Sequence, residues 1–493
     1  MLGDGGVRPE HIAAVAAGAG VTLSDDVGER LTTERAALDA GLSSGAAVYG
    51  VTHGLGARSG QRVAGMSDHE FAASTVRGRA HAVGAPLPEA VVRAAMGSRL
   101  AAFAAGGSAI SPGVASALAA LVNAQVTPVV PSIGSIGLSD LCQFAHVGLV
   151  LIGEGEATTP EGARLDGAAA LASARLDTAR LAAKDGLTLC GANPLAIGAA
   201  SLAAVRLQRL VDWATGLFGL SLVGFAANPS PLHPGAVGRR ADPDLDRVAA
   251  RLRHLVGGAA TAAVQVRRLQ DPVSFRAAPV SLAALSRVVR RLYDEARAEL
   301  NGSGDNPVLV EDQVVPTGNF HAPMLAQACD AAAIAVAAYA NSVVSRCQRF
   351  LQPTLTDLPA NLTDGPPHSS GLAPVIKIAQ SLVVQLHRQA APLSFDAREG
   401  ADAVEDDASN ASAAALRLLD LANGFAGLLA VEAVFAAQAV DLRAGSASGL
   451  GPELTALRAQ VRHLSPRLGD DRSLSSELDA LTRTMAASRP ATG

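Results

Sequence analysis

Long runs of apolar and small residues at helical spacing dominate the second half of the chain. They cover Met324–Leu351, Leu372–Ala390 and Asn410–Val440. Such alanine-rich runs predict helices of unusual length, because alanine has the highest intrinsic helix propensity. Apolar residues occur around most of each run rather than along one stripe, which is typical of bundle helices buried on several faces. The pattern therefore predicts a mainly α protein with a long central helical bundle.

The first half has shorter periodic segments separated by turn-rich stretches. Pro112–Asn123 predicts a helix with proline in its first turn, and Leu195–Leu220 predicts a long apolar helix. The more polar Thr158–Ala183 favours a small sheet, and a hairpin is expected from Val308–Val310 and Gln313–Val315. We expect three consecutive parts: an N-terminal domain with the active-site loops over 1–195, a helical bundle domain over 196–440, and short helices over 441–493.

Composition narrows the function classes. The 493 residues are 49% apolar and 17% charged, and the formal net charge of −5 gives no basic field for nucleic acid. The cysteines lack the spacing of metal ligands and are interpreted as buried, reduced thiols. They are Cys142, Cys190, Cys329 and Cys347. We expect no metal site.

The most apolar runs, such as Leu195–Val205 and Ala328–Ala340, are interrupted or short for a membrane span. The first residues have neither the basic nor the apolar region of a signal peptide. We therefore expect a cytoplasmic protein without a membrane partner.

A glycine-punctuated loop runs into an apolar helix over residues 131–146. Its centre reads Gly134-Ser-Ile-Gly137-Leu138-Ser139-Asp140-Leu141. Glycine adopts positive φ freely, so the two glycines mark tight backbone. Taken alone, the pattern predicts only a tight loop at the start of a helix.

This loop resembles the signature of the aromatic amino acid ammonia-lyases, and of histidine ammonia-lyases in particular. That family reads Gly-Ser-Val-Gly-Ala-Ser-Gly-Asp-Leu, and its Ala-Ser-Gly cyclises and dehydrates into the electrophilic methylidene-imidazolone group (MIO). Here one residue is missing, and Asp140 rather than glycine follows Leu138-Ser139. Cyclisation brings a backbone nitrogen onto the carbonyl carbon two residues earlier, which a residue with a Cβ resists. The resemblance implies the mainly α ammonia-lyase (fumarase/aspartase-like) fold, and we predict that this chain forms no MIO cofactor.

Two further motifs resemble family segments that carry the proposed catalytic base and a histidine of the substrate pocket. Tyr49-Gly-Val-Thr-His-Gly-Leu-Gly56 resembles the loop that carries the proposed base, which implies that Tyr49 takes the β-proton. His53 is a candidate second base or substrate contact, or a solvent-exposed residue. Arg79-Ala-His81 resembles a family motif that places His81 along the substrate pocket. The structural alternatives are a packing tyrosine and an ordinary surface or core histidine.

The substrate-binding side follows from later motifs. Lys184-Asp-Gly-Leu-Thr-Leu-Cys-Gly-Ala-Asn193 resembles a family segment whose electrophile-contacting Asn falls on Gly191, so Asn193 is the candidate to compensate. Gln270-Asp-Pro-Val-Ser-Phe-Arg276 resembles the motif in which the arginine binds the substrate carboxylate. The family's tyrosine beside the electrophile is Val273 here.

Further matches complete the implied site. The resemblance implies that Asn306 helps to hold the carboxylate and that Phe320 walls the pocket. Glu405 would face the substrate ring. Lys377 falls in the otherwise apolar Leu372–Ile378, where burial requires a partner such as Glu405. The alternative is that Lys377 reaches solvent.

These departures favour a substrate whose leaving group needs no electrophile. A quaternary trimethylammonium leaves as neutral trimethylamine, so the pattern resembles ergothionase, the branch of the family without MIO, which converts ergothioneine to thiourocanate and trimethylamine. Two alternatives remain open: a conventional ammonia-lyase that cyclises Leu138-Ser139-Asp140, and a non-catalytic homologue that binds an imidazole metabolite. The resemblance also implies a homotetramer whose active sites take residues from more than one subunit.

Overall fold

The computed structural model describes residues 6–262, 268–396, 404–443 and 449–491. The chain folds into two compact units, each built from separated segments. Unit 1 comprises Met1–Val205, Leu292–Asp330 and Pro392–Leu419, and unit 2 comprises Arg206–Arg291, Ala331–Ala391 and Asp420–Gly493. This division differs from the three consecutive parts expected from sequence, because four of its five boundaries fall inside long helices.

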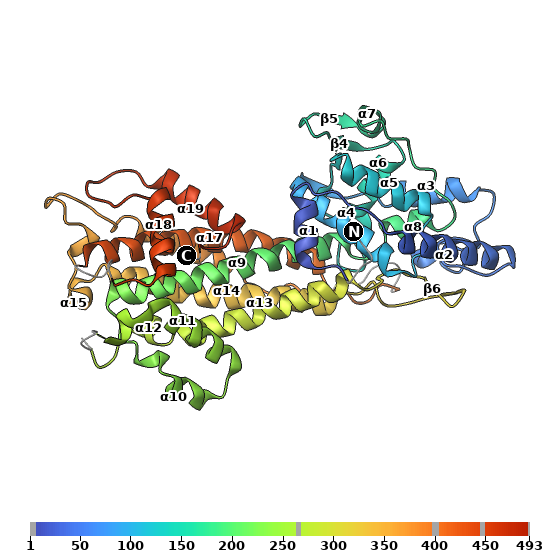
Figure 1. Cartoon of the computed structure of the whole chain (residues 1–493). Helices are drawn as coiled ribbons and strands as arrows, with labels where there is room; N and C mark the ends of the chain where they lie inside the picture. The colour runs from blue at the N-terminus through green and yellow to red at the C-terminus, as the bar shows by residue number, and fades with distance from the viewer. Residues whose placement is uncertain (1–5, 263–267, 397–403, 444–448, 492–493) are drawn as a thin grey trace. The chain divides into compact units, whose positions relative to one another are not determined.

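Four long helices contain those boundaries (Figure 1). They are α9 (Pro194–Phe225), α13 (Ala278–Leu300), α14 (Pro323–Phe350) and α17 (Ala411–Leu442). Of these, α9, α14 and α17 lie within a few residues of the helices predicted from their apolar runs. The side chains of α17 from Leu428 to Val440 are almost all fully buried, as expected for a helix that is apolar on all sides. The mainly α prediction is confirmed.

Unit 1 holds the shorter N-terminal helices around α4. They are α1 (Pro9–Ala16), α2 (Asp25–Ser43), α3 (Asp68–Arg77), α4 (Glu89–Ala105), α5 (Pro112–Asn123), α6 (Leu141–Leu151), α7 (Gly167–Ser173) and α8 (Asp185–Cys190). Met96, Leu100 and Phe103 of α4 are fully buried. The helix predicted over Pro112–Asn123 has those bounds in the structure.

Short antiparallel strands complete unit 1. They are β1 (Val83–Pro86) with β3 (Pro131–Ile133), β2 (Thr127–Pro128) with β4 (Glu156–Thr158) and β5 (Arg164–Asp166), and β6 (Val308–Val310) with β7 (Gln313–Val315). The last pair is the predicted hairpin, with Leu309 opposite Val314. The small sheet expected near Thr158–Ala183 is β2–β4–β5.

Close backbone approach fixes the start of α8. A Cβ on Gly186 would lie 2.1 Å from the Ala72 carbonyl oxygen of α3, so only glycine permits this packing. The preceding Lys184 has a positive φ of 70°, a conformation that costs a non-glycine residue roughly 1 kcal/mol or more. The local sequence thus holds residues 184–186 in a tightly constrained arrangement.

Unit 2 contains the remaining helices. They are α10 (Pro234–Val237), α11 (Pro243–Ala262), α12 (Val273–Arg276), α15 (Pro353–Thr356), α16 (Ile376–Gln389), α18 (Pro452–Leu464) and α19 (Ser475–Ala487). Within this unit a fully buried ion pair joins Arg346 of α14 to Glu432 of α17, with Nε–Oε1 at 2.6 Å. Ser221 of α9 donates a hydrogen bond to the same carboxylate at 3.1 Å.

Within the part of the chain that the structure describes, three helical stretches are long and apolar enough to cross a membrane by length and composition, so the expectation that the most apolar runs are interrupted or too short was wrong. They are Asp185–Phe225, Pro323–Phe350 and Ala411–Leu442, whose most apolar windows are 94%, 56% and 83% buried inside the protein. Most of their apolar surface therefore packs against the chain itself.

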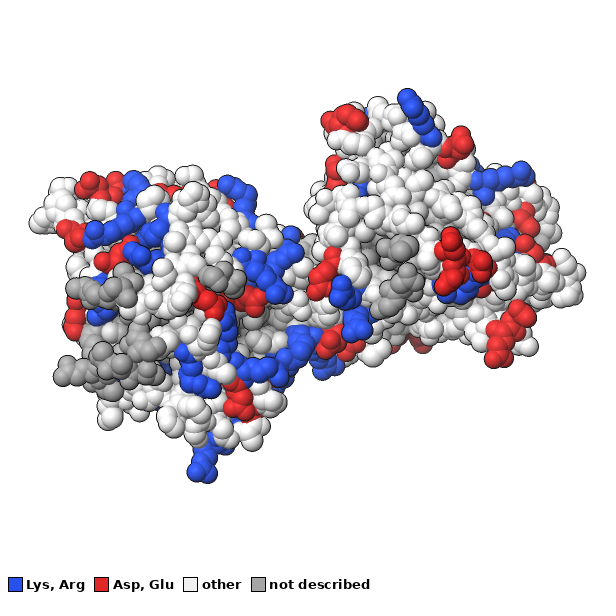
Figure 2. Space-filling view, in the orientation of Figure 1, with Lys and Arg blue, Asp and Glu red and all other residues white. Residues whose placement is uncertain are grey.

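The cysteines, the metal-ligating side chains and the surface charges can now be placed in the structure. Cys190, Cys329 and Cys347 are buried and Cys142 is half-buried, all as thiols. No group of three or more metal-ligating side chains occurs within the described residues. Acidic and basic residues are both distributed over the face shown in Figure 2.

Candidate active site

A cavity of about 550 Å³ lies in unit 1, among the loops that carry the sequence motifs. Its wall combines aromatic, acidic and hydroxyl side chains with one lysine. The polar and aromatic residues that line it are Tyr49, Ser59, Ser139, Lys184, Thr188, Asp305, Asn306, Phe320, His321, Glu405, Asp406 and Asp407. Of the residues predicted from sequence, the structure brings Tyr49, Asn306, Phe320 and Glu405 together here.

The tight loop at residues 137–139 forms part of the wall. Gly137 has φ 81°, and a Cβ there would lie 2.3 Å from Ser409 Oγ. The Ser409 hydroxyl donates to the Gly137 carbonyl at 2.8 Å. Ser139 also has a positive φ, of 67°, which is strained for a residue with a Cβ. The loop is thus locked against the segment that follows Glu405.

Asp140 tests whether this loop suits the cyclic MIO group. Its backbone N–H donates to the Ala192 carbonyl at 2.8 Å, whereas cyclisation requires this nitrogen to bond to the Leu138 carbonyl carbon. Its fully buried carboxyl accepts from Ser135 Oγ at 2.8 Å and from the Ala196 N–H at 2.9 Å. Burial raises the pKa of this carboxyl, and the hydrogen bonds partly offset that rise. Cyclisation would remove the Asp140 N–H and with it the hydrogen bond to the Ala192 carbonyl, so the residues present do not fit the group.

Tyr49 is half-buried on the glycine-rich loop. Its phenolic oxygen accepts the Gly56 backbone N–H at 3.1 Å, which fixes the ring across the loop. The backbone of His53, in the same loop, forms an isolated β-bridge with that of Tyr49. The His53 side-chain Nδ1 lies 3.0 Å from Thr52 Oγ1. The loop therefore presents the phenolic oxygen from a constrained position.

The segments on both sides of the β6–β7 hairpin supply the next part of the wall. The Asn306 side-chain oxygen accepts the Thr317 backbone N–H at 2.9 Å. This leaves the Asn306 amide NH₂ group to donate to a ligand. The Phe320 carbonyl accepts from Asn193 Nδ2 at 2.7 Å, which anchors the segment from behind.

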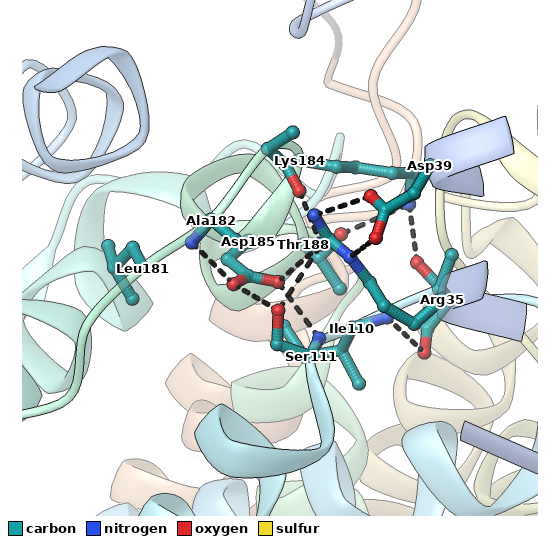
Figure 3. A network of polar contacts seen from close by, with 12 residues as sticks. Arg35, Asp39, Ile110, Ser111, Leu181, Ala182, Lys184, Asp185 and Thr188 are labelled. Carbon is teal, nitrogen blue, oxygen red and sulfur yellow. Dashed lines mark hydrogen bonds and ion pairs between the residues drawn. The ribbon is translucent and has the colours of Figure 1, made fainter. Parts of the chain in front are cut away.

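Lys184 is the basic side chain of the wall and is buried. Its Nζ donates to the Ser108 carbonyl at 2.6 Å and contacts Thr188 Oγ1 at 3.0 Å. Burial, the largest effect, lowers its pKa from 10.5 to about 8. The neighbouring Asp185 accepts from Ser111 N and Oγ at 2.9 and 2.7 Å. Figure 3 shows Lys184, Thr188, Asp185 and Ser111 within one network of polar contacts.

The acidic part of the wall is Glu405, Asp406 and Asp407. Glu405 is half-buried, whereas the Asp407 side chain is 74% exposed and its Oδ2 lies 3.5 Å from His321 Nε2. Asp305 differs from these three, because its buried carboxylate is paired with Arg99 at 2.5 Å. The three outer carboxylates give this part of the cavity a negative potential.

Three predicted site residues of unit 1 take other positions. Among the described residues that line the cavity, His53, His81 and Asn193 do not appear. His81 is exposed after α3, Asn193 is buried behind Phe320, and His53 lies beside Tyr49. Their predicted contacts with substrate stay predictions, and the structure supports a positioning role for Asn193.

The other three predicted residues, Gln270, Arg276 and Lys377, belong to unit 2. Arg276 is exposed on α12, and its guanidinium donates to Gln270 Oε1. Lys377 is exposed in the first turn of α16. In the single chain Lys377 therefore adopts the alternative in which its side chain reaches solvent, since α16 begins only at Ile376. Its pairing with Glu405 stays a prediction.

Comparison with known proteins places this site in a family. Residues 7–463 match the aromatic amino acid lyase family. The chain belongs to that family. It is 32% identical to the histidine ammonia-lyase of Anaeromyxobacter dehalogenans over 490 residues, which cover 96% of each protein.

Two solved structures of the lyase family share its fold. The ergothionase of Treponema denticola, in complex with desmethyl-ergothioneine sulfonic acid, gives a TM-score of 0.90 at 25% identity, with 98% of each chain covered. The histidine ammonia-lyase of Trypanosoma cruzi gives 0.89 at 27% identity, over 97% of this chain and 91% of that one. The predicted ammonia-lyase fold is confirmed.

Sequence reasoning missed several residues of the cavity. Lys184, Asp305 and His321 each lie inside a motif that matched the family, but no role was predicted for them. Asp305 and His321 directly adjoin the selected Asn306 and Phe320, so their proximity was available as a signal. For Lys184 the signal was its place at the head of the motif that ends at Asn193.

Proposed function

We propose that this member of the lyase family eliminates trimethylamine from a histidine-derived betaine such as ergothioneine, giving thiourocanate, without a prosthetic group. The proposal narrows the family's carbon–nitrogen lyase chemistry to one leaving group. A quaternary ammonium leaves as a neutral amine and needs no electrophile, whereas a primary amine must first be activated.

The observation that carries the proposal is the geometry of Leu138-Ser139-Asp140. The Asp140 nitrogen, which cyclisation would use, donates to the Ala192 carbonyl. The Asp140 carboxyl is buried under its own hydrogen bonds. A chain that keeps this arrangement needs a substrate that eliminates without MIO.

The walls of the cavity support a cationic substrate. Tyr49 and Phe320 both line it, and aromatic faces attract quaternary ammonium groups by cation–π interaction, worth about 0.5–2 kcal/mol each. The carboxylates of Glu405, Asp406 and Asp407 add a negative potential that favours entry of a cation.

In this elimination each of the following site residues has one role. The Tyr49 phenolate accepts the β-proton, the electrons of the C–H bond form the new double bond, and the C–N electrons leave on trimethylamine. Glu405 and Lys377 polarise the heteroaromatic ring, which acidifies the β-proton. Arg276, with Asn306, fixes the substrate carboxylate.

We further propose that the protein is cytoplasmic. It would form a homotetramer in which each active site is built from more than one subunit. Residues of unit 2 such as Arg276 and Lys377 would then meet a cavity of another subunit. Exposed apolar side chains on α14 and α16 support a buried interface of this kind. They are Met324, Ile334, Ile378 and Val384.

The test is incubation of the purified protein with ergothioneine, hercynine (its sulfur-free analogue) and histidine, assayed in parallel for trimethylamine, ammonia and the conjugated acrylate. We expect trimethylamine from a betaine and no ammonia from histidine. Comparison of ergothioneine with hercynine shows whether the sulfur is needed.

The second candidate is a conventional ammonia-lyase, favoured by the 32% identity to a histidine ammonia-lyase over nearly the whole chain. Ammonia from histidine would establish it and overturn the proposal. Turnover of none of the three substrates, together with binding of an imidazole metabolite, would favour the non-catalytic homologue.

A further inference from the structure

The chain uses lysine at only two positions. Of its 40 basic residues, Lys184 and Lys377 are the only lysines, and the other 38 are arginines (40 − 2). Arginine is always charged and presents a wide planar fork, whereas lysine is a compact donor whose charge responds to its surroundings. A lysine that is also buried at the wall of the active-site cavity therefore invites a functional explanation.

The immediate partners of Lys184 are neutral. Its Nζ lies 2.6 Å from the Ser108 carbonyl oxygen and 3.0 Å from Thr188 Oγ1. Asp305, whose charge attracts Lys184 most strongly, is taken by Arg99, which reaches both of its carboxylate oxygens, at 2.5 and 3.2 Å. These contacts use two of the three N–H groups of a protonated lysine.

The other charged groups around Lys184 are also occupied. Asp185 accepts from Ser111 and lies 3.5 Å from Arg35. Glu34 accepts the backbone N–H groups of residues 107 and 109, at 2.7 and 3.1 Å. Attraction to Asp305, Asp185 and Glu34 raises the pKa of Lys184, but burial and repulsion by Arg99 outweigh it, which leaves the pKa at about 8.

A buried ammonium with neutral partners is costly unless an anion approaches it. The cavity is the direction from which such an anion can come, because Lys184 lines it. Asn306 lines the same cavity, and its side-chain oxygen is held by Thr317, so its NH₂ group can donate to the same ligand. Together they offer a cation and an amide donor, which suit a carboxylate.

We propose that Lys184 binds the substrate carboxylate alongside Asn306, as a second cationic contact besides Arg276. The inference rests on the proposed function in assuming a carboxylate substrate. It gives the cavity of unit 1 an anion-binding group of its own, opposite in charge to Glu405, Asp406 and Asp407. A zwitterionic betaine then finds a positive and a negative contact within one wall.

The experiment is calorimetric binding of urocanate, which carries the carboxylate, and of 4-vinylimidazole, which lacks it. We expect Lys184→Met to lower the affinity for urocanate at least tenfold and to change the affinity for 4-vinylimidazole by less than threefold. The proposal would be overturned if the variant bound both ligands equally more weakly, or if it bound both as tightly as the wild type. Thr188→Val is the matched control, because it removes one neutral contact of Lys184 but keeps the ammonium.

Proton uptake gives a readout that a structural role would not produce. A bound carboxylate raises the pKa of Lys184, so at pH 8 urocanate binding to the wild type takes up about half a proton per site. Repeating the titration in buffers of different ionisation enthalpy measures this uptake. The measurement needs only the wild type, so it remains possible if Lys184→Met fails to fold. Absence of uptake by the wild type contradicts the proposal. Because no turnover is involved, a Lys184-dependent result with no trimethylamine release would reject only the betaine activity.

Discussion

Two buried cations of this chain have opposite surroundings. Arg346 in unit 2 is fully buried and meets the Glu432 carboxylate, the Tyr339 hydroxyl and the Ser274 carbonyl. Lys184 in unit 1 is buried with a carbonyl and a hydroxyl as its direct partners, and it lines a cavity.

The difference separates a structural charge from a functional one. The attraction of Glu432 and Tyr339 raises the pKa of Arg346 above its usual value despite burial, whereas burial lowers the pKa of Lys184. A charge whose counter-charge is built in stabilises the arrangement of its neighbours. A charge left without one is available to a ligand, at some cost to the stability of the free protein.

The largest effect is expected from breaking the satisfied pair. Glu432→Ala leaves Arg346 buried without its carboxylate, and we expect a loss of about 3–5 kcal/mol in the free energy of unfolding. Urea or thermal unfolding measures it. The double variant Arg346→Met with Glu432→Leu removes both charges and should recover most of this loss. A single variant as stable as the wild type would contradict the structural role.

On the cavity side, we expect loss of activity without loss of stability. Tyr49→Phe removes the proposed base while keeping the ring, and should lower kcat about 10²- to 10³-fold, or about 3–4 kcal/mol. Its unfolding midpoint should stay near that of the wild type, because the variant loses only the contact to Gly56. An unchanged kcat would assign proton abstraction to another group, with His53→Ala as the next variant to test.

The pH dependence of stability sharpens the comparison. The pKa of Lys184 is about 8 in the folded protein, against an ordinary value of 10.5, so between these pH values the unfolded chain binds one proton more. Stability of the wild type relative to Lys184→Met should therefore rise with pH from 8 to 10.5, by up to about 3 kcal/mol. Below pH 8 Lys184→Met should be the more stable protein. Parallel stability curves for the two proteins would contradict the buried, uncompensated charge.

The fold could be predicted well because its signals are local. The apolar runs of α9, α14 and α17 and the turn residues between β6 and β7 determine those elements within the segment itself. The two-unit division could not be predicted, because it depends on where packing changes along helices that have no break in sequence.

Predictability of the site was uneven. The motif matches selected Tyr49, Asn306, Phe320 and Glu405, which the structure brings to one cavity. Lys184 was missed because its burial results from helices far away in sequence, including α4 and the segment around Ser108. For Lys377 both a buried and a solvent-facing side chain stayed open, because periodicity does not show which side of a helix start meets solvent.

The central claim, elimination without an electrophile, is tested most directly by trimethylamine release from the betaine by Ser139→Ala. We expect turnover within about tenfold of the wild type, the value of one neutral hydrogen bond, because Ser139 contributes a wall hydroxyl and nothing covalent. Turnover reduced to background, in a variant that unfolds like the wild type, would mean that Ser139 enters a prosthetic group after all and would contradict the account.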